Sequence, residues 1–129
     1  MKLLDWSLMY DTYSESIVKQ AVPSVDGVYL IYHIVDNVYR VYNYVGQGNL
    51  QSRLLGHLSD EESNIGLKTR VKESHCGFVF APLDDAKERD GIEKYLYDFL
   101  SSNFVSLNNQ VSPHGDTSIP INMPEDKFM

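Results

Sequence analysis

The feature that most constrains the fold is a pair of strand-forming runs joined by a two-residue turn. The runs are "GVYLIYHIV" (residues 27–35) and "VYRVYNYVG" (residues 38–46). Both are rich in β-branched and aromatic residues, which favour strands. Asp36 and Asn37 stand between them, and these residue types are common in turns. The pattern predicts a β-hairpin.

A helix is expected on each side of this hairpin. Before it, apolar residues in the segment 11–22 recur near helical spacing, and Pro23 ends the pattern. After it, "GQGN" (residues 46–49) predicts a glycine-flanked loop whose last residue, Asn49, caps the next helix. On that helix a leucine recurs every four residues, from Leu50 to Leu58.

Three further elements are expected downstream. "IGLKTRVKESH" (residues 65–75) is the most basic segment and predicts a short helix, and "CGFVFAPL" (residues 76–83) predicts a brief strand stopped by proline. "DDAKERDGIEKYLYDFLSSN" (residues 84–103) predicts a long amphipathic helix with aspartates at its positive end. Gly91 inside that helix costs about 1 kcal/mol relative to alanine, so it is expected to mark a close approach.

The order of these elements predicts an α+β fold, with a small central three-stranded antiparallel sheet flanked by helices. Residues 1–22 are interpreted as a helical lead-in and residues 23–110 as the main domain. Residues 111–129 hold prolines with little periodicity. This segment is expected to be an irregular tail.

Composition narrows the classes of function. The 129 residues suit one domain, and the formal net charge of −7 repels phosphate backbones at long range. A nucleic-acid role would therefore need a local basic patch.

The single cysteine, Cys76, fits a reducing cytoplasm. Asp5 interrupts the apolar start, and no apolar run is long enough for a membrane span, so neither a signal peptide nor a membrane location is expected.

Two polar side chains stand on the leucine-bearing helix where apolar ones are expected. At about 100° per residue from Leu50, Arg53 falls at about 300° and His57 at about 340°, which places both on or beside the apolar face. Packing explains them if Arg53 extends over the edge of the core and His57 is a hydrogen-bonded, half-buried histidine. The alternative is that both face a site.

Glu93 and two tyrosines allow the same pair of interpretations. Glu93 lies at the edge of the long helix's apolar stripe, where it either pairs with a lysine or holds a hard cation such as Mg²⁺. Tyr29 and Tyr44 belong to strands that should be neighbours, where they either pack or take part in proton transfer at a phosphodiester.

Taken together, these segments resemble the GIY-YIG nuclease superfamily. "GVY" (residues 27–29) and "YVG" (residues 44–46) resemble its paired tripeptides, and "NLQSRLLGH" (residues 49–57) resembles its helix with the catalytic arginine. "GIEKYLYDFL" (residues 91–100) resembles the helix with the metal-ligand glutamate. "LNNQ" (residues 107–110) is similar to the asparagine motif. The resemblance covers about residues 23–109.

The resemblance implies a role for each matching residue. Tyr29 would lie near the attacking water or act as its general base, and Tyr44 would orient water and phosphate. Arg53 would stabilise charge on the phosphate, and His57 would assist proton transfer or bind phosphate. Glu93 would ligate one Mg²⁺ or Mn²⁺ ion. Asn108 would be structural. Apart from the resemblance, the basic run with Lys68, Arg70 and Lys72 is the candidate surface for contacts to a phosphate backbone, and Gly46 would let that backbone come close.

The implied function is that of a divalent-metal-dependent endonuclease acting on nucleic acid, with DNA expected before RNA. A domain of this size contacts few base pairs, so a homodimer or a partner chain is expected to supply specificity. Two alternatives remain open. One is a non-catalytic module of the same fold that binds nucleic acid or a partner protein. The other is a phage or defence-associated regulator whose acidity reflects a protein target.

Overall fold

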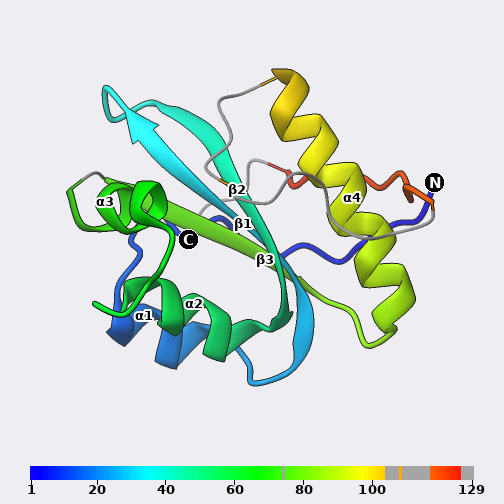
Figure 1. Cartoon of the computed structure of the whole chain (residues 1–129), viewed down its shortest axis with the longest axis horizontal. Helices are drawn as coiled ribbons and strands as arrows, with labels where there is room; N and C mark the ends of the chain where they lie inside the picture. Colours follow the sequence, from blue (N-terminus) through cyan, green and yellow to red (C-terminus); the bar gives the residue numbers. More distant parts are fainter. Residues whose placement is uncertain (74, 104–107, 109–116, 126–129) are drawn as a thin grey trace.

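The computed structural model describes residues 1–73, 75–103, 108 and 117–125 of the 129-residue chain. Its elements follow in the order α1 (Glu15–Ala21), β1 (Asp26–Val35), β2 (Tyr39–Asn49), α2 (Leu50–Leu58), α3 (Ile65–Glu73), β3 (Cys76–Pro82) and α4 (Ala86–Asn103) (Figure 1). The three strands form one antiparallel sheet in the order β2-β1-β3. The expected α+β fold with a small antiparallel sheet flanked by helices is therefore confirmed.

The turn between β1 and β2 has the backbone expected of a tight hairpin. Asp36 and Asn37 both take the left-handed conformation, with φ of 54° and 59°. Positive φ at both central residues gives a turn whose twist matches that of the flanking strands. Asp and Asn tolerate this conformation better than most residues. The local sequence therefore predicted the hairpin correctly.

The expected loop at residues 46–49 is wrong, because β2 continues through these residues to Asn49. Gly46 pairs with Tyr29 and Gly48 with Gly27 in the antiparallel ladder. The glycines serve close packing in a strand rather than a loop, and Gly48 needs its lack of side chain because its φ is +124°. Asn49 still caps α2 as expected, since its side-chain oxygen accepts a hydrogen bond from the Ser52 amide at 3.0 Å.

The sheet separates two apolar cores. Side chains alternate along each strand, so successive residues of β1 face opposite layers. One core packs the sheet against α4 and contains Val28, Leu30, Tyr32, Val45, Val79, Ala81, Ile92, Leu96 and Leu100. The other packs it against α1, α2 and α3 and contains Val18, Val22, Tyr29, Ile31, Leu50, Leu54, Leu67, Phe78 and Phe80. Figure 1 shows α4 on one side of the sheet and α1 and α2 on the other.

The described part of the tail packs against α4 and the N-terminal segment. The amide of Ile119 donates to the carbonyl of Gly91 at 3.0 Å, and a Cβ at Gly91 would lie 2.6 Å from the Ile119 side chain. The expected close approach at Gly91 is confirmed. Ile121 is only 1% exposed and forms a parallel bridge with Lys2. The remaining tail residues, 111–116 and 126–129, lie outside the described part of the chain.

β3 is an edge strand whose outer side is covered by the N-terminal segment. Tyr10 forms an antiparallel bridge with Phe78, and the two backbones exchange hydrogen bonds of 3.0 and 2.9 Å. Cys76, the first residue of β3, is 4% exposed, and its thiol lies 3.3 Å from the carbonyl oxygen of Arg70. Among the helices in the described residues, none combines the length and apolar character that a membrane span requires.

Candidate active site

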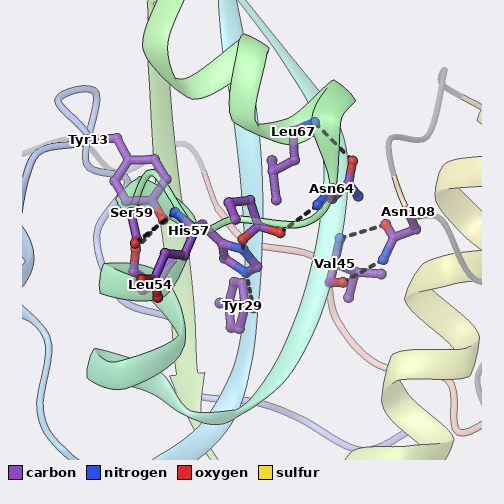
Figure 2. A network of polar contacts seen from close by, with 11 residues as sticks. Tyr13, Tyr29, Val45, Leu54, His57, Ser59, Asn64, Leu67 and Asn108 are labelled. Atoms are coloured by element: carbon purple, nitrogen blue, oxygen red, sulfur yellow. Dashed lines mark hydrogen bonds and ion pairs between the residues drawn. The ribbon is translucent and has the colours of Figure 1, made fainter.

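The centre of the site is a chain of three hydrogen-bonded side chains. The hydroxyl of Tyr29 on β1 lies 2.6 Å from Nε2 of His57 on α2 (Figure 2). Nδ1 of the same imidazole lies 2.6 Å from Oε2 of Glu62, in the segment between α2 and α3. Tyr29 is fully buried and His57 is 5% exposed. Because the imidazole uses both nitrogens, it connects a buried phenol to a carboxylate.

Glu62 is itself held in place by the turn that begins α3. Its second oxygen, Oε1, accepts a hydrogen bond from the Asn64 amide at 3.0 Å. The side-chain oxygen of Asn64 in turn accepts from the amide of Leu67 at 3.0 Å, which caps α3. Leu67 is fully buried in the core on this face of the sheet. The position of Glu62 is therefore fixed by the start of a packed helix.

Burial and neighbouring charges set the proton affinities of this chain. Burial raises the pKa of Tyr29 well above its usual value, although the Arg53 guanidinium opposes the rise. Burial lowers the pKa of His57, and its hydrogen bond to Glu62 opposes that fall. Burial would raise the pKa of Glu62, but the Asn64 amide and His57 outweigh it and lower that pKa. The favoured resting state is a neutral phenol, a neutral imidazole and a carboxylate.

Tyr44 and Gly46 on β2 shape the space around the phenol. The ring of Tyr44 packs edge-on against His57, with ring centroids 4.9 Å apart. The rings of Tyr29 and Tyr44 stack with centroids 6.3 Å apart. A Cβ at Gly46 would lie 2.2 Å from the Tyr29 hydroxyl, closer than any real contact. A glycine at position 46 is therefore what lets the Tyr29 ring lie across β2.

A cavity of about 520 Å³ opens beside this chain. Residues from α2, from the segment that follows it and from β2 line its wall, among them Tyr44, Arg53, His57, Glu62, Asn64 and Asn108. Asn108 is half-buried and Arg53 is exposed. The exposed guanidinium and the largely buried imidazole therefore line the same cavity.

Arg53 is positioned by the start of α2. The Asn49 cap begins the helix, and the buried leucines at positions 50 and 54 fix its rotation against the sheet. The stem of Arg53 then passes Gly48, where a Cβ would lie 3.4 Å from its Cγ. Tyr29 has the largest effect on the pKa of the guanidinium and raises it, whereas burial lowers it. Arg53 thus remains a cation beside Tyr29.

Glu93 belongs to α4, on the opposite side of the sheet from α2. It is half-buried, and burial together with Asp90 raises its pKa, whereas Gln47 and Arg53 act to lower it. Glu93 also raises the pKa of Tyr44 through its charge. The two helices lie on opposite sides of the sheet. The Glu93 carboxylate and the Arg53 guanidinium nevertheless act on each other's pKa, and Gln47 of β2 hydrogen-bonds to Glu93.

Gln47 connects this carboxylate region to a buried arginine. Its Oε1 accepts from Nε of Arg89 at 3.1 Å, so its Nε2 faces the carboxylate of Asp90, at 2.5 Å. Arg89 is 9% exposed and also donates to the carbonyls of Leu83 and Asp84. The orientation of the Gln47 amide is therefore fixed.

The donor set near Glu93 suits a hard divalent cation that keeps most of its water. No group of three or more His, Cys, Asp or Glu side chains with metal-binding geometry occurs within residues 1–73, 75–103, 108 and 117–125. Mg²⁺ is commonly held by one or two carboxylates, with water and substrate oxygens completing the octahedron. Glu93, with the neighbouring charge of Asp90, fits that pattern, whereas a closed site built from protein ligands alone does not.

Asn108 acts on the backbone of β2. Its Oδ1 accepts from the amide of Val45 at 3.1 Å, and its Nδ2 donates to the carbonyl of Val45 at 2.8 Å (Figure 2). The amide therefore replaces a neighbouring strand at one residue of the sheet edge. Leu107, Asn109 and Gln110, the other residues of the asparagine motif, lie outside the described part of the chain.

The basic residues expected to contact substrate lie away from the cavity. Lys72 forms an ion pair with Asp60, and the Lys68 ammonium donates to the Asp60 carbonyl at 2.8 Å. Arg70 lies near His33 on β1, where its charge lowers the pKa of that imidazole after the larger effect of burial. The structure thus brings Tyr29, Tyr44, Arg53 and His57 together and places Lys68, Arg70 and Lys72 elsewhere. Glu93 does not line the cavity, although its charge acts on Tyr44 and Arg53.

Sequence reasoning missed Glu62, Asp90 and Gln47. Glu62 belongs to the acidic run "DEES" (residues 60–63), and nothing in the sequence distinguishes it from the other acids of that run. Its only signal is an acid five residues beyond a histidine that lies on an apolar helix face. Asp90 precedes Glu93 by three residues, a spacing that places both on one side of a helix.

Comparisons with protein-family models, with characterised proteins and with solved structures find no match for this chain.

Proposed function

We propose that this protein is a divalent-metal-dependent endonuclease that hydrolyses phosphodiester bonds in nucleic acid, with DNA as the expected substrate. The observation that carries the proposal is the buried Tyr29–His57–Glu62 chain beside an exposed arginine at the wall of one cavity. A phenol and an imidazole can move a proton, and a guanidinium can stabilise the charge on a phosphate. The resemblance to GIY-YIG nucleases supports the same function.

Each side chain has a role in the proposed reaction. Arg53 binds the non-bridging oxygens of the scissile phosphate and stabilises the negative charge that grows in the transition state. Tyr29 relays a proton from the attacking water to His57, which requires that substrate binding admits the water to a hydroxyl that is fully buried in the free protein. Tyr44, whose ring packs against the rings of Tyr29 and His57, orients the water and the phosphate.

Glu93 is the proposed ligand for a single Mg²⁺ or Mn²⁺ ion. The charges of Glu93 and Arg53 act on each other, so a cation held by Glu93 would act on the same phosphate as the guanidinium. Such an ion polarises the scissile phosphate and stabilises the leaving oxygen when it is bound. Asn108 is proposed to keep the edge of β2 in place beneath this arrangement.

Substrate specificity is proposed to come from a second copy of the chain or from another protein. The net charge is −7, and two of the basic residues of α3 already face Asp60. Since counterion release from phosphate contacts supplies most non-specific affinity for DNA, and few basic side chains are available to make such contacts, this domain alone should bind weakly and with a shallow dependence on salt.

Incubation with plasmid, branched and single-stranded DNA in Mg²⁺ or Mn²⁺ tests the function. Cleavage by the wild type is expected, with a loss on the order of 10²-fold or more in Arg53→Ala, since removal of one transition-state donor typically costs that much. Glu93→Ala should lose metal-dependent activity altogether. Absence of metal-dependent cleavage on every substrate would contradict the proposal.

Two exposed residues provide matched controls. Lys87→Ala removes a cation and Asp98→Asn removes an acid, and both residues lie on α4 with exposed side chains. Each should cleave at the wild-type rate. Urea unfolding of all four variants separates a loss of catalysis from a loss of fold. Equal rates in wild type, Arg53→Ala and Glu93→Ala would show that any cleavage comes from a contaminant.

A non-catalytic binding module is the second candidate, and one observation favours it. The cavity wall contains Glu61 and Glu62 beside Arg53, so the surface presented to a polyanion is not uniformly basic. On this alternative the protein binds nucleic acid in a salt-sensitive way without turnover, or binds a partner protein instead. Titration of labelled DNA at two salt concentrations, beside the cleavage assay, separates the two functions.

A further inference from the structure

We propose that Glu62 is a positioning residue that selects one tautomer of His57, the form that carries its proton on Nδ1 and offers Nε2 as the acceptor for the Tyr29 proton. The inference rests on the proposed function for its catalytic consequence. It rests on geometry alone for the tautomer itself. Neither the resemblance nor the sequence pattern assigns a role to Glu62.

The acceptor atoms around the imidazole decide the tautomer. Nδ1 lies 2.6 Å from Oε2 of Glu62, and a carboxylate can only accept hydrogen bonds. Nδ1 must therefore carry the proton. Nε2, 2.6 Å from the Tyr29 oxygen, is then left with its lone pair, and the phenol O–H must donate to it. A hydrogen bond made by one ring nitrogen fixes the protonation of the other.

The carboxylate is well placed for this role because it has little freedom of its own. The side chain of Glu62 is 12% exposed, and its other oxygen already accepts from the Asn64 amide at 3.0 Å. The amide of Asn64 belongs to the turn that begins α3. The His57 tautomer is thus linked to a backbone group whose position is set by the packing of a helix.

This tautomer allows a balanced proton transfer. The attacking water gives one proton to the Tyr29 oxygen while the Tyr29 proton moves to Nε2 of His57, and the water oxygen forms the new P–O bond. The bond from phosphorus to the leaving oxygen breaks, and that oxygen takes a proton from solvent. The resulting imidazolium lies against the Glu62 carboxylate, so the two charges are paired in a buried place. His57 later returns its extra proton to solvent.

Other titratable and charged groups of the described residues face or approach His57. Within the described residues they are Tyr29 from β1, Tyr44 from β2, Arg53 from α2 and Glu62 from the α2–α3 segment. Tyr13 of the N-terminal segment lies nearby, where its hydroxyl donates to the Leu54 carbonyl and the Glu62 charge raises its pKa. Arg53 disfavours an imidazolium and Glu62 favours it. Burial raises the pKa of all three tyrosines, which keeps them neutral. Glu62 is therefore the one anion in this set that can stabilise the protonated ring.

Glu62→Gln is the informative variant because the Asn64 amide dictates how the new side chain must turn. A backbone N–H can bond only to the oxygen of the glutamine amide, so the NH₂ group faces Nδ1 of His57. Nδ1 must then accept, and the proton moves to Nε2. The imidazole would donate to Tyr29 and could no longer take its proton. The variant thus inverts the tautomer with almost no change in shape.

Long-range ¹H–¹⁵N NMR of the ¹⁵N-histidine-labelled full chain measures the tautomer directly. The His57 signals are assigned by their loss in His57→Gln. The wild type should show the Nδ1-protonated form and Glu62→Gln the Nε2-protonated form. The pKa of His57 should be lower in Glu62→Gln, because the carboxylate that raises it is gone. Asp98→Asn makes the same charge change far from the cavity and should alter neither value.

Cleavage kinetics give the second readout. Glu62→Gln should lower kcat by about 10²-fold or more with little change in KM, because the substrate contacts remain while the proton acceptor is lost. Urea unfolding should show that Glu62→Gln is folded in the absence of urea and unfolds cooperatively. A purely structural Glu62 would instead leave the tautomer of His57 as in the wild type, with any activity loss following stability.

The two proposals can fail separately. An Nε2-protonated His57 in the wild type, or an unchanged tautomer in Glu62→Gln, overturns the role of Glu62 even if the protein is a nuclease. Wild-type kcat in Glu62→Gln overturns it as well. If no substrate is cleaved but the tautomer inverts as expected, the positioning role stands and the nuclease function fails.

Discussion

At the scale of single residues, the contact between Gly46 and Tyr29 shows why the two tripeptides must occur together. Tyr29 lies opposite Gly46 in the hairpin register, and its ring occupies the space where a side chain at position 46 would begin. The glycine is thus a requirement of the buried phenol. A larger residue there would displace the hydroxyl that bonds to His57.

Gly46→Ala should therefore destabilise the protein by about 1–3 kcal/mol, the usual cost of overpacking a core. The matched substitution is Gly56→Ala in α2, where a Cβ would meet nothing within 4 Å. Alanine at that exposed helical position should stabilise by about 0.5–1 kcal/mol. Urea unfolding of both variants measures the two signs, and equal shifts in the same direction would contradict the packing argument.

Periodicity could place some site residues and not others. The apolar repeat of α2 predicts its buried face, so His57 could be assigned to that face and Arg53 to its border from the sequence alone; in the structure His57 is buried and Arg53 is exposed. Glu62 lies outside any regular element, and its direction depends on a hydrogen bond to the Asn64 amide. No spacing rule describes such a contact. The carboxylate was therefore visible only once the chain was folded.

At the scale of secondary-structure elements, one side chain covers the outer edge of β2 at a single residue. An unpaired strand edge exposes backbone donors and acceptors to solvent or to another chain. Asn108 satisfies both backbone groups of Val45, whose side chain belongs to the core against α4. The clamp therefore supports the strand that also carries Tyr44 and Gly46.

Asn108→Ala should cost about 1–2 kcal/mol, since two hydrogen bonds to the edge of the sheet are lost. Hydrogen exchange at the Val45 amide should speed up, because that N–H becomes accessible to water. Asn108→Asp can still accept from the amide but cannot donate to the carbonyl, so it should fall between wild type and alanine. Unchanged protection of Val45 in the alanine variant would show that the clamp does not matter.

The elements themselves were easier to predict than their ends. The hairpin turn, the cap at Asn49 and the stop near Pro82 each rest on local chemistry, and each lies where expected. The extension of β2 through residues 46–49 was missed because glycine usually signals a loop. Only the pairing with β1, together with the ring of Tyr29, explains glycines in a strand.

At the scale of the whole molecule, a segment near the N-terminus packs against the described part of the tail. The side-chain amide of Asn122 accepts from the Leu4 amide at 2.6 Å and donates to the Leu4 carbonyl at 3.1 Å. The indole of Trp6 donates to the Asn122 carbonyl at 2.8 Å. These contacts join residues more than a hundred positions apart, which no local pattern can reveal. The sequence therefore indicated the irregular backbone of residues 117–125 but not their packing.

Cys76 gives the whole molecule a built-in reporter of its own opening. Burial at the start of β3 raises the pKa of the thiol to about 11, so almost none is thiolate at neutral pH. Alkylation of the native protein at pH 7.5 should therefore be at least about 10-fold slower than in urea. Mass spectrometry over time measures both rates, and similar rates would contradict this burial. Since the chain has no other cysteine, the labelling rate counts how often β3 separates from its neighbours, without an added probe.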